Sequence, residues 1–326
     1  FWRNKMKKQL LIAAVAATMG TAAMADISIT GNAEYKYTHT DNSNTNATTN
    51  GATTEVNLKF KGQHGDTTVY LDQEFIQDNS TVNQSTASDM LDIENMYLTT
   101  KVGPLSVTAG NWAGSTSANT GMIKDNARSA SKLSVSTDAG PLKVGFWTTP
   151  GNGSSDGFTV SGSVAGVNIG IKEASNQYTD IKVSGEIAGV SYHLDNYDAE
   201  ATIDDAFYGM VSKEFNGVTL TVNHMEAKRG ATLTENDGAF GKIFEGDGTT
   251  YKISRIAGAM DVAGNAVTLA VLNSTEDNGS DNDAVKATVA RTLAAGMVVT
   301  GTYQNVDNRV ADGDTATTSL ELDVSF

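Results

Sequence analysis

From Asp26 onward, apolar and polar side chains alternate with a period of two residues, and helical spacing fits these windows less well. In one run Val56, Leu58 and Phe60 are separated by charged or amide residues, and residues 190–195 repeat the pattern. Consecutive side chains of a β-strand point to opposite faces, so this alternation predicts strands with one apolar and one polar face. The sequence therefore predicts an all-β chain.

The links between the predicted strands are short and long in turn along the whole chain. Turn-forming residues fill the short links, which are residues 62–66, 102–104, 138–141, 165–166, 188–189, 216–217, 259–264 and 294–296. Longer polar segments lie between them, at residues 40–51, 78–89, 111–131, 151–156, 175–177, 198–205, 228–248, 274–283 and 307–315. This order predicts an antiparallel up-and-down meander with one tight rim and one loop-rich rim, as in outer-membrane barrels.

A soluble β-sandwich is the main alternative, because its strands also alternate. Sandwich connections cross between two sheets and leave loops of mixed length at both ends. Here the polar faces carry charges and must meet water, while the apolar faces need lipid or a second sheet, for which no strands remain. We therefore predict a transmembrane β-barrel, and the short links give eighteen strands, enough to enclose a water-filled lumen.

The composition narrows the possible functions. The chain has 38 acidic and 23 basic residues, a formal charge of −15 and a mean hydropathy of −0.26. This charge has the wrong sign for binding nucleic acid, and the absence of cysteine excludes disulfides and thiolate sites. No nucleophile motif adjoins any of the 4 histidines, so no enzyme activity, metal site or cofactor is predicted. Loose divalent-cation binding stays open for acidic loops such as residues 276–283, which lack the closing Glu of an EF-hand.

The first 25 residues have the features of a secretory signal peptide with upstream residues. Met6 is followed by two lysines, an apolar run over residues 10–17, and the small-residue pattern Ala23-Met24-Ala25. The apolar run is shorter than the about 20 residues that a spanning helix needs. We expect cleavage after Ala25, which leaves a barrel domain of residues 26–326 with a formal charge of −19.

Three stretches resemble the general diffusion porins of the Gram-negative outer membrane, over essentially the whole chain after residue 25. They are residues 26–34, similar to the family's first strand, residues 94–111, similar to its hairpin before an inward-folded loop, and an aromatic-terminated last strand over residues 320–326. The resemblance implies sixteen strands, so the overall expectation is an antiparallel barrel of 16 to 18 strands. It also implies that the segment Trp112–Ser131 is the inward-folded constriction loop.

The same resemblance implies a cell location and partners. The protein would lie in the outer membrane among lipid and lipopolysaccharide, as a homotrimer that passes ions and small hydrophilic solutes by passive diffusion. Phe326 would be the terminal aromatic that the outer-membrane assembly machinery recognises. Two other functions stay open, namely a receptor or adhesin acting through acidic outer loops, and a substrate-specific channel.

The polar strand faces and the inward loop supply the candidate pore-lining residues. These are Glu34, Lys36, Lys59, Lys61, Asp72, Glu74, Asp92, Glu94, Asn111, Lys124, Asp125, Arg128, Lys132 and Lys143. The family's constriction usually contains an arginine cluster, yet Glu94 and Asn111 stand at positions where arginine is common. Lysines could take the place of these arginines, but each lysine carries a point charge on a flexible side chain. They would therefore fix the geometry of the constriction less sharply than arginines do.

The charge distribution predicts a pore that prefers cations, because acidic residues concentrated at the pore mouth attract cations and repel anions. The rival prediction is an anion filter made by basic residues that gather at the narrowest point, namely Lys36, Lys59, Lys61, Lys132, Lys143 and Arg128. Several aromatic residues fall on the apolar parity and are expected to form girdles at the membrane interfaces. They are Tyr35, Tyr37, Tyr97, Tyr192, Tyr303 and Phe326.

Overall fold

A computed structural model of the chain gives the arrangement of its strands. It describes residues 26–43, 45–78, 92–112, 123–125, 132–149, 155–175, 177–199, 205–228, 233–235, 250–277, 281–308 and 313–326. The expected signal peptide, residues 1–25, and Arg128 lie outside the described residues. No helix in the described part of the chain is long and apolar enough to cross a membrane.

Twenty strands are present in the described residues, and eighteen of them form one sheet. In order they are β1 (Asp26–Asn42), β2 (Ala47–His64), β3 (Thr67–Asp78), β4 (Asp92–Val102), β5 (Leu105–Asn111), β6 (Ile123–Asp125), β7 (Lys132–Ala139), β8 (Leu142–Thr148), β9 (Asp156–Val164), β10 (Val167–Ala174), β11 (Tyr178–Ile187), β12 (Val190–Ala199), β13 (Ala206–Phe215), β14 (Val218–Lys228), β15 (Leu233–Glu235), β16 (Thr250–Val262), β17 (Asn265–Glu276), β18 (Asp281–Ala294), β19 (Met297–Asn308) and β20 (Gly313–Ser325).

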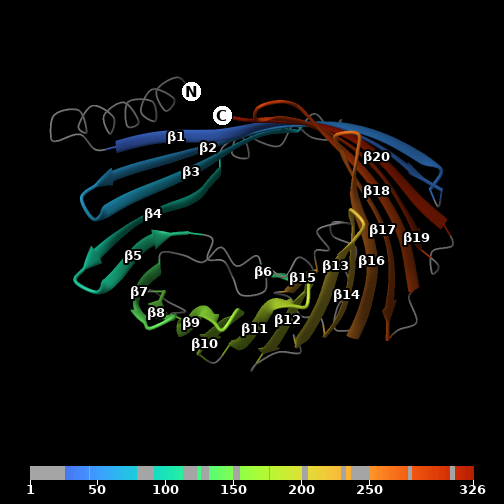
Figure 1. Ribbon diagram of the computed structural model, residues 1–326. Coiled ribbons are helices and arrows are strands. Elements are labelled where there is room, and N and C mark those ends of the chain that lie inside the picture. Colours follow the sequence, from blue (N-terminus) through green and yellow to red (C-terminus); the bar gives the residue numbers. More distant parts are fainter. Residues whose placement is uncertain are drawn as a thin grey trace, which may run out of the picture.

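The large sheet closes into a barrel, seen as a ring of strands in Figure 1. Each strand pairs antiparallel with its neighbours in the ring, and β1 pairs with β20 from Asn32↔Ser325 to Asn42↔Thr315. At this seam the Gly31 N–H donates to the Phe326 carbonyl at 2.8 Å, and the Phe326 N–H donates to the Gly31 carbonyl at 2.9 Å. The eighteen strands predicted from the short links are confirmed, and the sixteen implied by the resemblance are wrong.

Two-residue turns join the strands at the tight rim. In four of these turns both residues have positive φ, at Ala165-Gly166, Ala188-Gly189, Asn216-Gly217 and Ala263-Gly264. Two consecutive positive φ angles define the type I′ turn, whose twist matches that of the flanking strands. Glycine suits this conformation because it lacks a Cβ, whereas alanine is strained there.

The two faces of the sheet differ as the alternation predicts. Exposed apolar side chains such as Ile29, Phe146, Leu269 and Leu320 lie on the outward face. Charged and amide residues of β1 to β4 lie on the inward face, where they pair in register with one another. The outward face is therefore suited to lipid, and this part of the inward face is suited to water.

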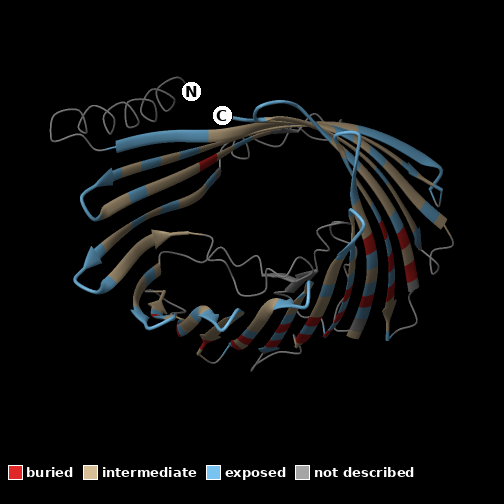
Figure 2. Ribbon diagram, viewed as in Figure 1, coloured by how far each residue is buried: buried red, intermediate tan, exposed pale blue. Residues whose placement is uncertain are grey.

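One part of the inward face does not follow this rule. On β10 to β14 and β16 to β18, side chains that alternate with the outward ones are buried, and they appear as red bands on these strands in Figure 2. We call this surface the covered wall, and its apolar members are Ala174, Tyr178, Tyr197, Ala206, Tyr208, Met225, Ala227, Ile253, Ala257, Ala270, Leu272 and Ala284. The sequence analysis did not anticipate an apolar inward surface.

The two strands outside the large sheet pair with each other, from Leu233↔Asp125 to Glu235↔Ile123. β6 belongs to the segment between β5 and β7, whereas β15 belongs to the segment between β14 and β16. β5 and β14 stand on nearly opposite sides of the ring, and the pair lies inside the ring in Figure 1. Ile123–Asp125 belong to the predicted inward loop Trp112–Ser131, and they pair with Leu233–Glu235 of a segment that was expected to be an ordinary loop. Residues 113–122 and 126–131 of the predicted loop lie outside the described residues.

Candidate functional site: the acidic wall of the lumen

Strands β20, β1, β2, β3 and β4 are consecutive in the ring and place many charges on its inward face. We call a group of seven carboxylates and three ammonium groups on this face the acidic wall; Asp26 and Lys101 share the inward parity but lie nearer the tight rim. Its charged members are Glu34, Lys36, Glu55, Lys59, Lys61, Asp72, Glu74, Glu94, Glu321 and Asp323. Strand pairing brings these residues together from both ends of the chain.

Neighbouring groups on the acidic wall hold one another in place. Lys36 Nζ lies 3.1 Å from Glu321 Oε2 across the seam. Asn57 donates from Nδ2 to Glu55 Oε1 at 2.5 Å, and Asn95 donates from Nδ2 to Asp72 Oδ2 at 2.8 Å. These contacts orient the carboxylates of Glu55, Asp72 and Glu321. A hollow of about 140 Å³ opens between β1 and β4, lined by Asn32, Glu55, Asn57, Leu58, Lys59, Asp72, Gln73, Glu74 and Glu94.

An aromatic group adjoins the acidic wall on β3, β4 and the residue after β5. The rings of Tyr70 and Tyr97 stack with centroids 4.7 Å apart, and Trp112 lies 5.8 Å from Tyr97. Lys61 Nζ lies 5.9 Å from the centre of the Tyr70 ring, and Lys132 Nζ lies 5.6 Å from that of Trp112. These are cation–π contacts, so each ammonium group is attracted to a ring face.

The position of Tyr97 corrects the prediction that it faces lipid. The register between β3 and β4 shifts between Asp72 and Gln73, so that Asp72 pairs with Asn95 but Gln73 pairs with Ile93. The extra residue on β4, Glu94, forms a β-bulge, and a bulge exchanges the faces of the residues that follow. Tyr97 therefore stacks on Tyr70, on the lumen side.

The other predicted pore-lining residues have different positions. Glu34, Lys36, Lys59, Lys61, Asp72, Glu74 and Glu94 lie together on the acidic wall, and Asn111 and Lys132 follow on β5 and β7. Lys143 lies near the tight rim on β8, away from this group. Asp92 lies on β4, and Lys124 and Asp125 lie on β6, where only their backbone positions are described. The sequence analysis missed Glu321 and Asp323, which barrel closure and the parity of the last strand could have indicated.

The covered wall contains a buried charged group. Asp180 on β11 and Asp195 on β12 are 2% and 1% exposed, and Lys182 Nζ lies 3.9 Å and 3.6 Å from one oxygen of each. Asp180 Oδ1 and both Asp195 carboxylate oxygens have no hydrogen-bond partner. Carboxylates so placed are costly to ionise unless a cation or a proton compensates them.

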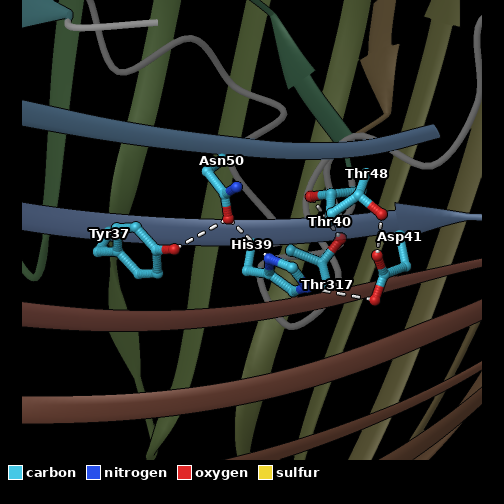
Figure 3. Close-up of polar contacts among 7 residues, drawn as sticks. All are labelled: Tyr37, His39, Thr40, Asp41, Thr48, Asn50 and Thr317. Atoms are coloured by element: carbon cyan, nitrogen blue, oxygen red, sulfur yellow. Dashed lines mark hydrogen bonds and ion pairs between the residues drawn. The ribbon is translucent and has the colours of Figure 1, made fainter.

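Polar residues also lie on the outward face, at its loop-rich end, as Figure 3 shows for β1 and β2. Asn50 Oδ1 accepts a hydrogen bond from Tyr37 Oη at 2.9 Å and lies 2.7 Å from His39 Nδ1. His39 Nε2 lies 3.2 Å from Asp41 Oδ2, and Thr48 donates to Asp41 Oδ1 at 2.7 Å. Similar polar pairs continue this collar on other strands, namely His224–Ser254, Glu226–Lys252, Lys228–Asp205 and Asn273–Asp283.

In the described part of the chain, no group of three or more His, Cys, Asp or Glu residues has the geometry to hold a metal ion. The acidic wall is instead a charged and partly exposed surface of the lumen. It can attract and orient small ions and polar solutes, because its charged groups are partly solvated and lie on a rigid sheet.

No family model and no curated protein matches the sequence. The fold does match solved structures, each over nearly the whole of both chains. OccAB4 of Acinetobacter baumannii matches with a TM-score of 0.67 and 9% identity, over 92% of this chain and 98% of that chain. OpdK of Pseudomonas aeruginosa, solved with vanillate, gives 0.64 and 10%, over 92% and 98%.

The anion-selective porin from Comamonas acidovorans gives a TM-score of 0.56 and 10% identity, over 93% of this chain and all of that chain. At such low identities the likeness concerns the fold, and it carries no information about selectivity or solutes. The chain therefore has the closed antiparallel barrel fold of these proteins, with eighteen strands in its own ring.

Proposed function

We propose that this protein is an outer-membrane porin that passes ions and small hydrophilic solutes by passive diffusion, with a preference for cations. The observation that carries the proposal is the acidic wall, where seven carboxylates and three ammonium groups share one inward surface. Fixed charges of one sign raise the local concentration of counter-ions and exclude co-ions. The barrel fold shared with porins supports the channel part of the proposal.

The outward face supports a location in the outer membrane. Its apolar residues suit hydrocarbon, and the polar collar around His39 and Asp41 suits the headgroup region of lipid or lipopolysaccharide. We include in the proposal export by the signal peptide, assembly through Phe326 and a homotrimeric state. Mass spectrometry of the purified protein is expected to give Asp26 as the first residue, and an intact Lys7-Lys8 segment would contradict export.

A bilayer recording with a KCl gradient tests the channel proposal directly. We expect steady ohmic conductance and a reversal potential of the sign that cations produce. The preference should be strongest at low salt, because the Debye length is only about 8 Å at physiological ionic strength. An anion preference that survives molar salt and disappears in Lys59→Gln/Lys61→Gln would establish the anion-filter alternative.

A substrate-specific channel is the second candidate, favoured by the aromatic group of Tyr70, Tyr97 and Trp112 beside Lys61 and Lys132. Such a group offers ring faces and fixed charge to a planar or charged solute. Liposome-swelling rates separate the two candidates. A passive pore should sort solutes by size and charge without saturation, whereas a specific channel should saturate with one class of solute.

A further inference from the structure

We propose that the water path runs off the barrel axis, along the acidic wall, and that the covered wall takes no part in it. The inference rests on the proposed function and adds which half of the barrel determines selectivity. It assigns a role in selectivity to Glu321 and Asp323 of β20. These two residues lie far in sequence from the other charged residues of the acidic wall.

The two inward surfaces differ in burial. On the acidic wall the side chains of Lys36 and Glu321 are 41% and 29% exposed, although they form an ion pair. On the covered wall Met225 is 0% and Ile253 is 1% exposed. Outward neighbours of these residues, such as Val222 and Ile256, are well exposed, so the burial affects the inward face alone.

Polar groups of the covered wall are shielded from solvent as fully as its apolar side chains. Asp180, Asp195 and Asn223 are at least nine-tenths buried, and each has a side-chain oxygen without a hydrogen-bond partner. A carboxylate that lined a water path would be solvated, because removing a charged oxygen from water costs free energy. These groups therefore lie behind the surface that solutes meet.

The β6–β15 pair also occupies part of the lumen. Its two strands follow β5 and β14 in the chain, which stand on nearly opposite sides of the ring, and the pair lies inside the ring (Figure 1). The space that this pair leaves open includes the acidic wall, where the side chains of Lys36 and Glu321 remain partly exposed.

The geometry also sets the class of solute. A path beside seven carboxylates and three ammonium groups favours small cations and organic amines over carboxylates of the same size. Lys182 lies on the covered wall, beside Asp180 and Asp195, and these two carboxylates balance its charge there.

Because the chain has no cysteine, single-cysteine variants can map the path. Ser319→Cys and Asn57→Cys place a thiol on the acidic wall, whereas Ala227→Cys and Ala284→Cys place one on the covered wall, at buried positions with little change in size. Asp66→Cys, in an exposed turn, is the positive control. Each folded barrel is treated with a membrane-impermeant cationic methanethiosulfonate, and denatured samples give the total thiol.

We expect thiols on the acidic wall to react at least about tenfold faster than those on the covered wall. A thiol on the covered wall is buried, so it can react only after the structure around it opens locally. In bilayers the added positive charge at residues 319 and 57 should reduce cation preference, and treatment of the other two variants should leave it unchanged. Equal reaction rates on both walls, or an altered reversal potential from Ala227→Cys or Ala284→Cys alone, would overturn the inference. If thiols on the acidic wall react faster than those on the covered wall but no current is recorded in bilayers, the proposed path is supported and the proposed function is refuted.

Discussion

Lys36 and Glu321 form an ion pair across the seam that closes the barrel, with Nζ and Oε2 3.1 Å apart. The pair joins β1 to β20 at directly opposed positions, and both side chains keep part of their surface in the lumen. Exposed ion pairs add at most about 1 kcal/mol to stability. Their more important effect here is to fix two charges beside the proposed water path.

Glu321→Gln is therefore expected to lower the cation-to-anion permeability ratio, because it removes one wall carboxylate and leaves Lys36 unpaired. Lys36→Gln should raise the ratio by the opposite change. Reversal potentials in a KCl gradient measure both, with heat-modifiable migration as the control for folding. Two shifts of the same sign would contradict the assignment of this pair to the path.

Gly31→Ala is expected to weaken the seam. A Cβ at residue 31 would overlap the Asn57 carbonyl oxygen and meet the Phe326 ring at 3.0 Å, where the backbone of Gly31 also pairs with Phe326. Such crowding costs about 1–3 kcal/mol. Gly51→Ala is the matched control, since a Cβ there meets nothing within 4 Å. Thermal unfolding followed on gels should show a lower midpoint for Gly31→Ala only.

The turn at Ala188-Gly189 allows a test in both directions. Ala188 has φ +52° and Gly189 has φ +72°, so both residues are in the left-handed region. Ala188→Asn should stabilise the barrel, because asparagine tolerates this region better, and Gly189→Ala should destabilise it by about 1–2 kcal/mol. A Cβ at residue 189 meets no atom within 4 Å, so the loss would measure backbone strain alone. Urea unfolding in detergent micelles gives both values.

The buried group on the covered wall predicts different effects on stability for two substitutions of similar size. Asp195→Asn removes one of two adjacent buried carboxylates and should leave stability unchanged or increased, with Lys182 still beside Asp180. Lys182→Met should cost about 3–5 kcal/mol, because it leaves buried carboxylates without the ammonium group next to them. Comparable losses in the two variants would show that the group acts as a single ionised network.

The alternation of apolar and polar side chains predicted the strands and their two faces. The alternation of short and long links then predicted eighteen strands in one ring, because it gives the number of hairpins. The side-chain pattern could not place Tyr97, since the bulge at Glu94 shifts the parity and has no clear signal in sequence. It also missed the covered wall. Met225 and Ile253 stand on the inward parity and become buried only within the assembled lumen, which no single strand's pattern reveals. Glu321 was missed because its neighbours on β1 are nearly the whole chain away.

Closure between β1 and β20 has a consequence for how the barrel forms. Asn32 and Asp323, whose side chains meet at the seam, are separated by 291 positions, so this contact carries a large loop-closure entropy. Until it forms, both terminal strands keep unpaired backbone groups, which are a template for pairing with another chain. We therefore expect seam formation to be the slow, aggregation-prone stage of folding, and a factor that shields β1 and β20 until they meet to accelerate productive assembly.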